Sequence, residues 1–375
     1  MRRLTRSFNT DQDPGLGLPF RTLITIVLCV SHKPTETMCK HLAKIVTPLI
    51  VLMISSACAQ ERQTASTGSD VVVTEWPVPW ERTRPRDPYV APDGRVWFCG
   101  QTGGYLGVLD PESGEFARYE LGEGASPHNL IVDNDGFVWY AGNRRAHIGR
   151  LDPETGDIKK YDMPEKDAVD PHTLVFDSDG NIWFTLQGSN MIGHLNTSSG
   201  EVRLVTAPTA RSRPYGIWLD SSERPWVALF GTNKLAVVDP VTMELTEIDL
   251  ERERIRPRRL VVTSDDNVWF VDYVGGYMGR YEPDTGFITE FAMPGGDSAR
   301  PYGMIVDEKD RIWFVETGVS PNRFVGFDTA TGSFLGGTDI PSGGGSVRHM
   351  YYDASTRSVW FGTDTNHIGR AVLPG

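Results

Sequence analysis

The chain has 375 residues, of which 39% are hydrophobic and 10% aromatic; this composition is ordinary for a globular protein and excludes a disordered chain. The formal net charge of −12 at pH 7 argues against nucleic acid and anionic membrane surfaces as partners, because an acidic body repels phosphate groups. Of the four cysteines only Cys99 follows residue 58, so neither a disulfide framework nor a CxxC metal site is expected.

The N-terminal region has the pattern of a targeting segment. From Met38 a short basic stretch is followed by an apolar run and then by small residues up to Ala59, which is the order of a secretory signal. Residues 1–37 precede this signal, so Met38 is the expected true start. Cleavage after Ala59, lipidation at Cys58 and a retained membrane anchor are the alternatives. We predict that residues 1–59 are an extension with a signal peptide, and that the protein is exported and is periplasmic, secreted or lipid-anchored at the membrane surface.

Residues 60–70 are polar, and we expect a linker there. Beyond it the sequence repeats around a tryptophan that follows Val, Ile or Pro. The seven copies are Trp97, Trp139, Trp183, Trp226, Trp269, Trp313 and Trp360, at spacings of 42, 44, 43, 43, 44 and 47 residues. Each unit has four short segments of alternating apolar residues between Gly, Asp, Asn or Pro turns. Residues 71–375 are therefore predicted to form an all-β, seven-bladed β-propeller of four-stranded antiparallel blades.

The two ends of the repeat region complement each other. Six units end in an outer strand, but the seventh stops at Gly375 without one. Residues 71–77 read Val-Val-Val-Thr-Glu-Trp-Pro and match the outer strand in residues 287–294. We therefore predict that the N-terminal strand completes the last blade, which would close the ring and cover an otherwise exposed strand edge.

Most of the recurring polar motifs are explained by turns. The Asp-Pro-Glu-Ser/Thr-Gly elements, such as Asp110–Gly114, place an Asp where it can bind nearby backbone amides and a Gly where φ is positive. The Asp-rich segment Asp133–Gly136 resembles part of a calcium loop but lacks the later ligands, so a hairpin turn is preferred. The repeated tryptophans are expected to pack between blades.

One position differs in chemical type from blade to blade: the start of the innermost strand, which lines the mouth of the central channel in this architecture. The residues assigned to it are Tyr89, His128, His172, Tyr215, Arg258, Tyr302 and His349. Because equivalent positions converge on one axis, we predict a site there for a small molecule or a cyclic peptide. The residues expected to contact that ligand are His128, His172, Tyr215 and Arg258.

A second set of polar residues follows the tryptophan strand. Its carboxylates Asp272, Glu316 and Asp364 come from consecutive blades and could share a divalent cation, which prefers oxygen ligands. The alternative is that they are solvated or are partners of Arg258 and Arg348.

The repeat R/S-P-H/Y-x-I/L-x-x-D, followed by I/V-W-F, I-G-R-x-D and T-E-F-x-M/L/I-P, resembles the streptogramin B lyase (virginiamycin B lyase) family over essentially residues 71–375. The resemblance implies a magnesium-assisted elimination that opens a cyclic depsipeptide at its ester. By position, the family's first-blade Tyr falls on Tyr89, its catalytic His on His349 and its last-blade Glu on Asp364. The chain departs from the family at Tyr302, where the family has His, and at Val347, where it has an acidic residue.

Three functions are compatible with this sequence. In an elimination enzyme, His349 would remove the proton α to a carbonyl, a metal held by Asp364 and Glu316 would polarise that carbonyl, and Tyr89 or Tyr302 would assist the leaving oxygen. The alternatives are a noncatalytic module that binds an acidic ligand or a protein, and a metal-dependent lactone hydrolase. We expect a monomer that does not bind nucleic acid.

Overall fold

The computed structural model describes residues 71–122 and 124–375. The predicted signal segment, the alternative lipid anchor at Cys58 and the linker therefore lie outside the described residues. Within the described ranges, no helix is long and apolar enough to cross a membrane.

The described chain is built almost entirely of short strands. Blade 1 contains β2 (Pro85–Val90), β3 (Val96–Gly100), β4 (Tyr105–Leu109) and β5 (Phe116–Glu120). Blade 2 contains β6 (Pro127–Val132), β7 (Val138–Gly142), β8 (His147–Leu151) and β9 (Ile158–Asp162), with a 3-10 turn η1 (Asn143–Arg145). Blade 3 contains β10 (Pro171–Phe176), β11 (Ile182–Leu186), β12 (Met191–Leu195) and β13 (Val202–Thr206).

The remaining blades follow the same order. Blade 4 contains β14 (Pro214–Leu219), β15 (Pro225–Leu229), β16 (Lys234–Val238) and β17 (Leu245–Asp249). Blade 5 contains β18 (Pro257–Val262), β19 (Val268–Asp272), β20 (Tyr277–Tyr281) and β21 (Ile288–Ala292). Blade 6 contains β22 (Pro301–Val306), β23 (Arg311–Glu316), β24 (Arg323–Asp328) and β25 (Ser333–Asp339), preceded by the 3-10 turn η2 (Gly296–Ser298). Blade 7 contains β26 (Val347–Asp353), β27 (Ser358–Thr363), β28 (His367–Val372) and β1 (Val72–Pro77).

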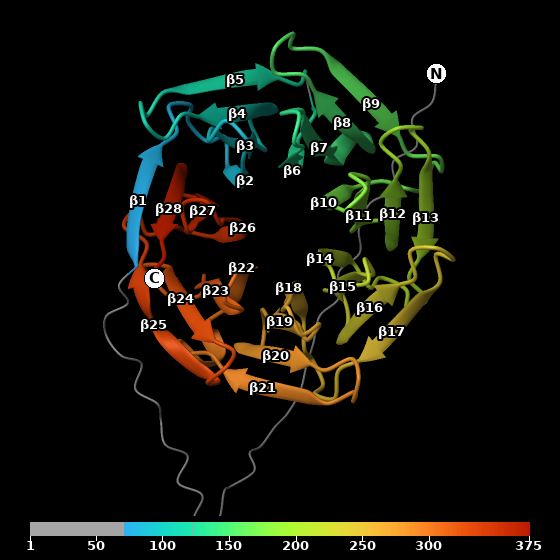
Figure 1. Cartoon of the computed structure of the whole chain (residues 1–375), viewed down its shortest axis with the longest axis vertical. Helices are drawn as coiled ribbons and strands as arrows, with labels where there is room; N and C mark the ends of the chain where they lie inside the picture. Colours follow the sequence, from blue (N-terminus) through green and yellow to red (C-terminus); the bar gives the residue numbers. More distant parts are fainter. Residues whose placement is uncertain (1–70, 123) are drawn as a thin grey trace, which may run out of the picture. The chain divides into compact units, whose positions relative to one another are not determined.

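These strands form seven four-stranded antiparallel sheets around a central axis, with the first strand of each blade innermost (Figure 1). The predicted seven-bladed propeller is confirmed. Its closure is confirmed as well, because β1 pairs with β28 from Val72↔Val372 to Pro77↔His367. We call the two ends of the ring the hairpin end, which carries the turns between first and second strands, and the loop end, which carries the connections between blades.

Large aromatic side chains fill the space between neighbouring blades. Trp97 of blade 1 is 1% exposed and packs in one cluster with Tyr140 of blade 2. The glycine of the recurring Ile-Gly-Arg motif makes room for such rings: in blade 2, a Cβ on Gly149 would lie 2.2 Å from the ring of Tyr140, its neighbour across the strand pair. The glycine of this motif is therefore explained by packing within the blade. The expectation that the tryptophans pack between blades is confirmed.

The Asp-rich hairpins are structural. In blade 2, the Asp133 carboxylate accepts hydrogen bonds from the backbone amide of Phe137 at 2.9 Å and from the indole nitrogen of Trp139 at 2.8 Å. Blade 6 repeats the arrangement with Asp307 and Trp313. This carboxylate orients both the turn and the tryptophan, so the preferred hairpin interpretation of Asp133–Gly136 is confirmed.

Candidate functional site

The innermost strands share a distortion close to their first residue. Six begin with a proline, and in all seven the pairing register shifts within the next residues, for example between Pro127 and Leu130. Such a bulge releases residues from the ladder and re-aims their side chains. These strands surround the central axis (Figure 1), and side chains from different blades meet there, as Arg259 of blade 5 does with Asp87 of blade 1.

A cluster of charged and polar side chains joins four blades at this level. Arg86 of blade 1 binds its neighbour Asp87 through Nε and Oδ1 at 3.0 Å, and Asp87 is fully buried. Arg259 of blade 5 lies across the axis, with its Nη2 3.8 Å from the Asp87 Oδ2 and its Nη1 3.0 Å from the hydroxyl of Thr173. Asn129 of blade 2 donates to Asp87 at 3.0 Å. These contacts hold opposite sides of the ring together.

Histidine and tyrosine rings continue the cluster. The rings of His128 and His172 lie 3.7 Å apart, and Tyr215 follows 4.0 Å from His172. The hydroxyl groups of Tyr215 and Tyr302 are hydrogen-bonded to each other. The guanidinium of Arg258 lies over the Tyr302 ring, 3.7 Å from its centroid. The structure thus brings together all four predicted ligand-contacting residues and Tyr302.

His349 belongs to the same cluster but occupies a different register from His128. It is partly buried on β26, and its Nδ1 has no hydrogen-bond partner among the residues described. Burial and the nearby Arg259 lower the pKa of His349 to about 3, although Asp87 acts in the opposite direction. The imidazole is therefore neutral near pH 7, and the low pKa makes it a weak base unless its protonated form is stabilised.

The other two channel histidines are held neutral for the same reasons. Burial, and then Arg86, lower the pKa of His128 well below its ordinary value. Burial, and then Arg259, do the same for His172. Both rings act as hydrogen-bonding groups without charge.

These histidines predict a specific acid sensitivity. A folded pKa below the ordinary value of about 6.5 means that the unfolded chain binds more protons, so the free energy of unfolding falls as the pH decreases below 6.5. Each histidine can contribute up to about 1.4 kcal/mol per pH unit. Melting curves between pH 7.5 and 4.5 should show a shallower loss for H172Q than for the unsubstituted chain. The control is H194Q, which removes a histidine outside the cluster whose Nε2 lies 3.1 Å from Oδ2 of Asp177. An unchanged slope in H172Q would contradict the prediction.

The three predicted metal carboxylates do not come together. Asp272 and Glu316 are fully buried, and each of the three is bound by an arginine of its own. The pairs are Asp272 with Arg252, Glu316 with Arg323, and Asp364 with Arg348. Within residues 71–122 and 124–375, no group of three or more His, Cys, Asp or Glu side chains is arranged to hold a metal ion. This donor set does not fit a shared cation, which corrects the expectation drawn from these residues, and magnesium use stays a prediction.

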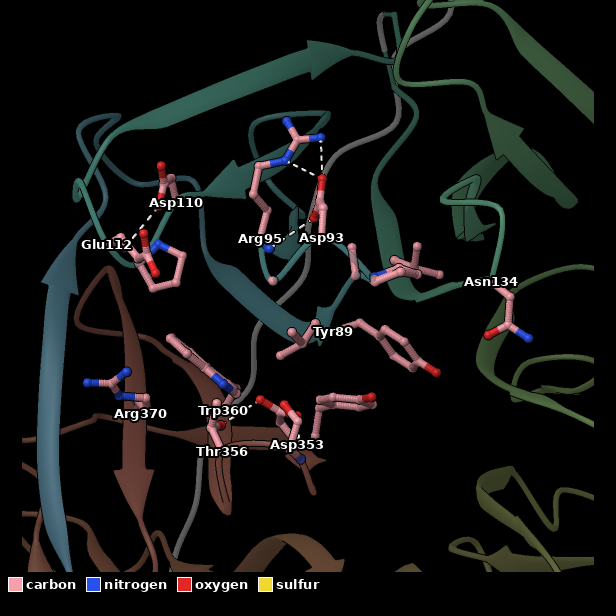
Figure 2. A pocket seen from close by; sticks show the side chains of 18 of the residues that line it. Tyr89, Asp93, Arg95, Asp110, Glu112, Asn134, Asp353, Thr356, Trp360 and Arg370 are labelled. Atoms are coloured by element: carbon pink, nitrogen blue, oxygen red, sulfur yellow. Dashed lines mark hydrogen bonds and ion pairs between the residues drawn. The ribbon is translucent and has the colours of Figure 1, made fainter.

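Tyr89 lies away from the arginine cluster, near the hairpin end. It pairs with Trp97, as Ile131 pairs with Trp139, so it does not occupy the position of His128. Its ring lies 4.1 Å from that of Tyr351, and both line a groove of about 840 Å³ between blades 7, 1 and 2 (Figure 2). The equivalence drawn between Tyr89 and the other ring residues was therefore wrong.

Arg86, not Tyr89, takes that position in blade 1, and a signal for it was present. In six blades a proline precedes the tryptophan by twelve residues, as Pro127 precedes Trp139; in blade 1 this proline is Pro85. The sequence interpretation aligned Pro88 instead and missed the central residues of the cluster. These are Arg86, Asp87, Asn129, Thr173 and Arg259.

Comparisons with known proteins agree with the propeller architecture. A model of the virginiamycin B lyase family matches residues 57–324. Virginiamycin B lyase from Staphylococcus aureus is 25% identical with a TM-score of 0.73, and the match covers 81% of this chain and 100% of that one. A catalytically inactive form of that enzyme with quinupristin is 26% identical, with the same coverage and TM-score. Hydrazine synthase from Kuenenia stuttgartiensis, 14% identical with a TM-score of 0.63 over 79% of this chain and 97% of that one, shares the fold. No curated protein matches the sequence.

Proposed function

The chain belongs to the virginiamycin B lyase family, and we propose on this basis that it is a carbon–oxygen lyase that opens a cyclic ester or depsipeptide by elimination. The observation that carries the proposal is the state of His349 on the channel axis. Its imidazole is neutral and partly exposed, and its Nδ1, which is buried, has no hydrogen-bond partner within the described part of the chain. A neutral imidazole is the form that a general base needs.

The reaction balances without water. His349 takes the proton α to a carbonyl, the electrons of that C–H bond form a carbon–carbon double bond, and the β carbon–oxygen bond breaks. Its electrons leave with the ester oxygen, which becomes part of a carboxylate. The ring opens at unchanged mass.

Other residues of the cluster fit supporting roles. Asp87 acts on His349 electrostatically and favours its protonated form, which is the form that proton removal produces. The family has an acidic residue where this chain has Val347. We propose that Asp87 takes over the role of that acidic residue here. Tyr302, whose hydroxyl is hydrogen-bonded to that of Tyr215, is proposed to assist the leaving oxygen.

The proposal includes features that rest on the sequence and the family. Export is proposed because the residues from Met38 to Ala59 follow the order of a secretory signal. Use of magnesium is proposed because the family resemblance implies it, although the carboxylates described above do not form its site. A ligand of the cyclic depsipeptide class is proposed from the same resemblance.

Mass spectrometry tests the activity directly. The purified protein is incubated with a streptogramin B-type depsipeptide and with several simple lactones, with Mg²⁺ in one series and with EDTA in a matched series. Ring opening at unchanged mass, with a new double bond, is the expected result. Loss of turnover in EDTA would support the proposed use of a metal.

The other outcomes contradict the proposal in distinguishable ways. A product heavier by one water would replace elimination with hydrolysis and favour a lactone hydrolase. Absence of any product, together with measurable binding of the depsipeptide, would favour a noncatalytic ligand-binding propeller. Tyr302 and Val347 would then be the departures from the family to restore first, by Y302H and V347E.

A further inference from the structure

Positive charge is in excess at the centre of the channel. Arg86 and Arg259 share one carboxylate, that of Asp87. Arg258 contacts aromatic rings, and among the described residues it forms no ion pair with a carboxylate. The cluster therefore contains three guanidinium groups and one carboxylate, in a chain whose formal net charge is −12. A local cationic centre in an acidic protein concentrates field lines on an anion.

The same cluster contains buried polar atoms without a hydrogen-bond partner in the described residues. Arg86 and Arg259 are almost completely buried, with side-chain exposures of 4% and 3%. Buried donors are nearly always hydrogen-bonded, because leaving them unpaired costs free energy. Six buried nitrogen atoms nevertheless lack a hydrogen-bond partner within residues 71–122 and 124–375, although Nη2 of Arg259 lies 3.8 Å from Oδ2 of Asp87. They are Nη2 of Arg86, Nε of Arg258, Nη2 of Arg259, Nδ1 of His128, Nε2 of His172 and Nδ1 of His349.

The nearby positive charge lowers the pKa of Tyr215. Burial alone would raise the pKa of its hydroxyl, but Arg258, Arg259 and Arg86 together lower it below the ordinary value. The aromatic rings around Arg258 stabilise its charge through their faces, with Tyr273 4.3 Å and Phe230 4.7 Å from the guanidinium carbon. These rings stabilise the charge of Arg258, but none of them is a carboxylate partner for it.

The donors favour a flat oxyanion. A guanidinium group presents parallel N–H bonds that match the two oxygens of a carboxylate. The two buried arginines approach from opposite sides of the ring, blades 1 and 5, while Arg258 is partly exposed and lies on the same strand as Arg259. An anion that enters beside Arg258 would meet the unpaired donors of the deeper pair.

We propose that the centre of the channel is a carboxylate-binding site formed by Arg86, Arg258 and Arg259. The use of this site in catalysis rests on the proposed function: elimination converts a neutral ester into a carboxylate, and a site that binds the carboxylate stabilises the leaving group as its charge develops. The anion-binding site itself does not depend on turnover.

Acetate is a suitable probe because it carries the carboxylate and little else. Melting temperature is measured against acetate concentration at constant ionic strength, with acetate replacing chloride, and binding is measured by calorimetry. A saturable rise in melting temperature is expected for the unsubstituted protein. For R258Q the apparent dissociation constant should rise at least tenfold, and R258K should lie between them because lysine keeps the charge but loses the planar donors.

The matched control is R252Q. Arg252 also carries a buried carboxylate contact, to Asp272, but it lies outside the channel cluster. Acetate should raise the melting temperature of R252Q by as much as that of the unsubstituted protein, whether or not R252Q melts at a lower temperature without acetate. Because R258Q alters the partly exposed arginine, it is the variant expected to stay folded; R259Q provides a second test if its melt remains cooperative.

The outcomes separate this proposal from the proposed function. Saturable acetate binding that is weakened in R258Q but not in R252Q supports the site, even if no cyclic ester is opened. The site is overturned if the protein shows no saturable response to acetate, or if R258Q responds as strongly as the unsubstituted protein. If that protein still turns over a depsipeptide, the lyase activity is unaffected by this result.

Discussion

Deletion of residues 71–79 is expected to prevent the ring from closing and to leave a chain that no longer melts cooperatively. This segment contains β1, which supplies the outer strand of blade 7 and pairs with β28 over six residues. Removing it exposes the edge of β28, and exposed edges pair with other chains. We therefore expect loss of the folded monomer and aggregation at micromolar concentration.

β1 and its flanking residues bury side chains whose removal would cost much of the free energy of folding. Val71 and Val78 are 6% and 4% exposed, and full burial of such a side chain is worth about 1.5–3 kcal/mol. Glu75 accepts hydrogen bonds from the backbone amide and the hydroxyl of Ser342 at 2.6 and 2.7 Å, and bonds to a charged group are worth about 1.5–3 kcal/mol each. The total is comparable with the whole stability of a typical domain, about 5–15 kcal/mol.

Circular dichroism melts and size-exclusion chromatography check this prediction on the full chain. The matched control is V72A, because Val72 lies in the same strand but is 63% exposed. V72A should melt within a few degrees of the unsubstituted protein. A deletion variant that stays monomeric and melts as cooperatively as V72A would show that β1 does not close the ring in solution.

Replacement of His349 by alanine is expected to lower kcat by roughly 10²–10⁴-fold, the range for loss of a general base. The melting temperature should change little, because the ring is only partly buried and its Nδ1 has no bond to lose within the described residues. Turnover of the depsipeptide by mass spectrometry and the thermal melt are measured on the same preparation.

A second histidine variant separates chemistry from folding. H194Q alters a histidine on β12 that binds Asp177 near the hairpin end, outside the channel cluster. It should retain the unsubstituted turnover. H349A with more than a tenth of that turnover, or H194Q with an equal loss, would show that His349 is not the base.

The pH profile adds an independent check. Because the pKa of His349 is about 3, its neutral form persists well below pH 6.5. The chemical step should therefore not lose rate between pH 7.5 and 5.5, where an ordinary histidine becomes protonated. A rate that halves near pH 6.5 would contradict this environment.

The sequence by itself determined the blades, their number and their closure. Each depends on local chemistry: alternating apolar residues form strands, Asp and Gly form turns, and the tryptophan period counts the units. Residues 71–77 could be assigned to blade 7 because they match an outer strand residue by residue. The convergence of His128, His172 and Tyr215 also followed from their common place in the repeat.

The register of the first blade could have been predicted, but it needed a spacing rule. The distance from Pro85 to Trp97 equals that from Pro127 to Trp139, whereas the motif containing Pro88 resembles the other blades only by composition. A shift of three residues moved Tyr89 out of the cluster. Register is fixed by pairing along the whole strand and by the bulge, not by a dipeptide.

Only the tertiary structure decided which charges meet. Arg259 reaches Asp87 from the opposite side of the ring, while Asp272 and Glu316 are bound by arginines of their own blades and the preceding loops. Which charged side chains become partners depends on the curvature of the ring and on the direction that each bulge gives its side chains. Neither can be predicted from the residues of a single repeat. The sequence therefore determined an axial ring of polar groups, and the fold decided that its centre is cationic.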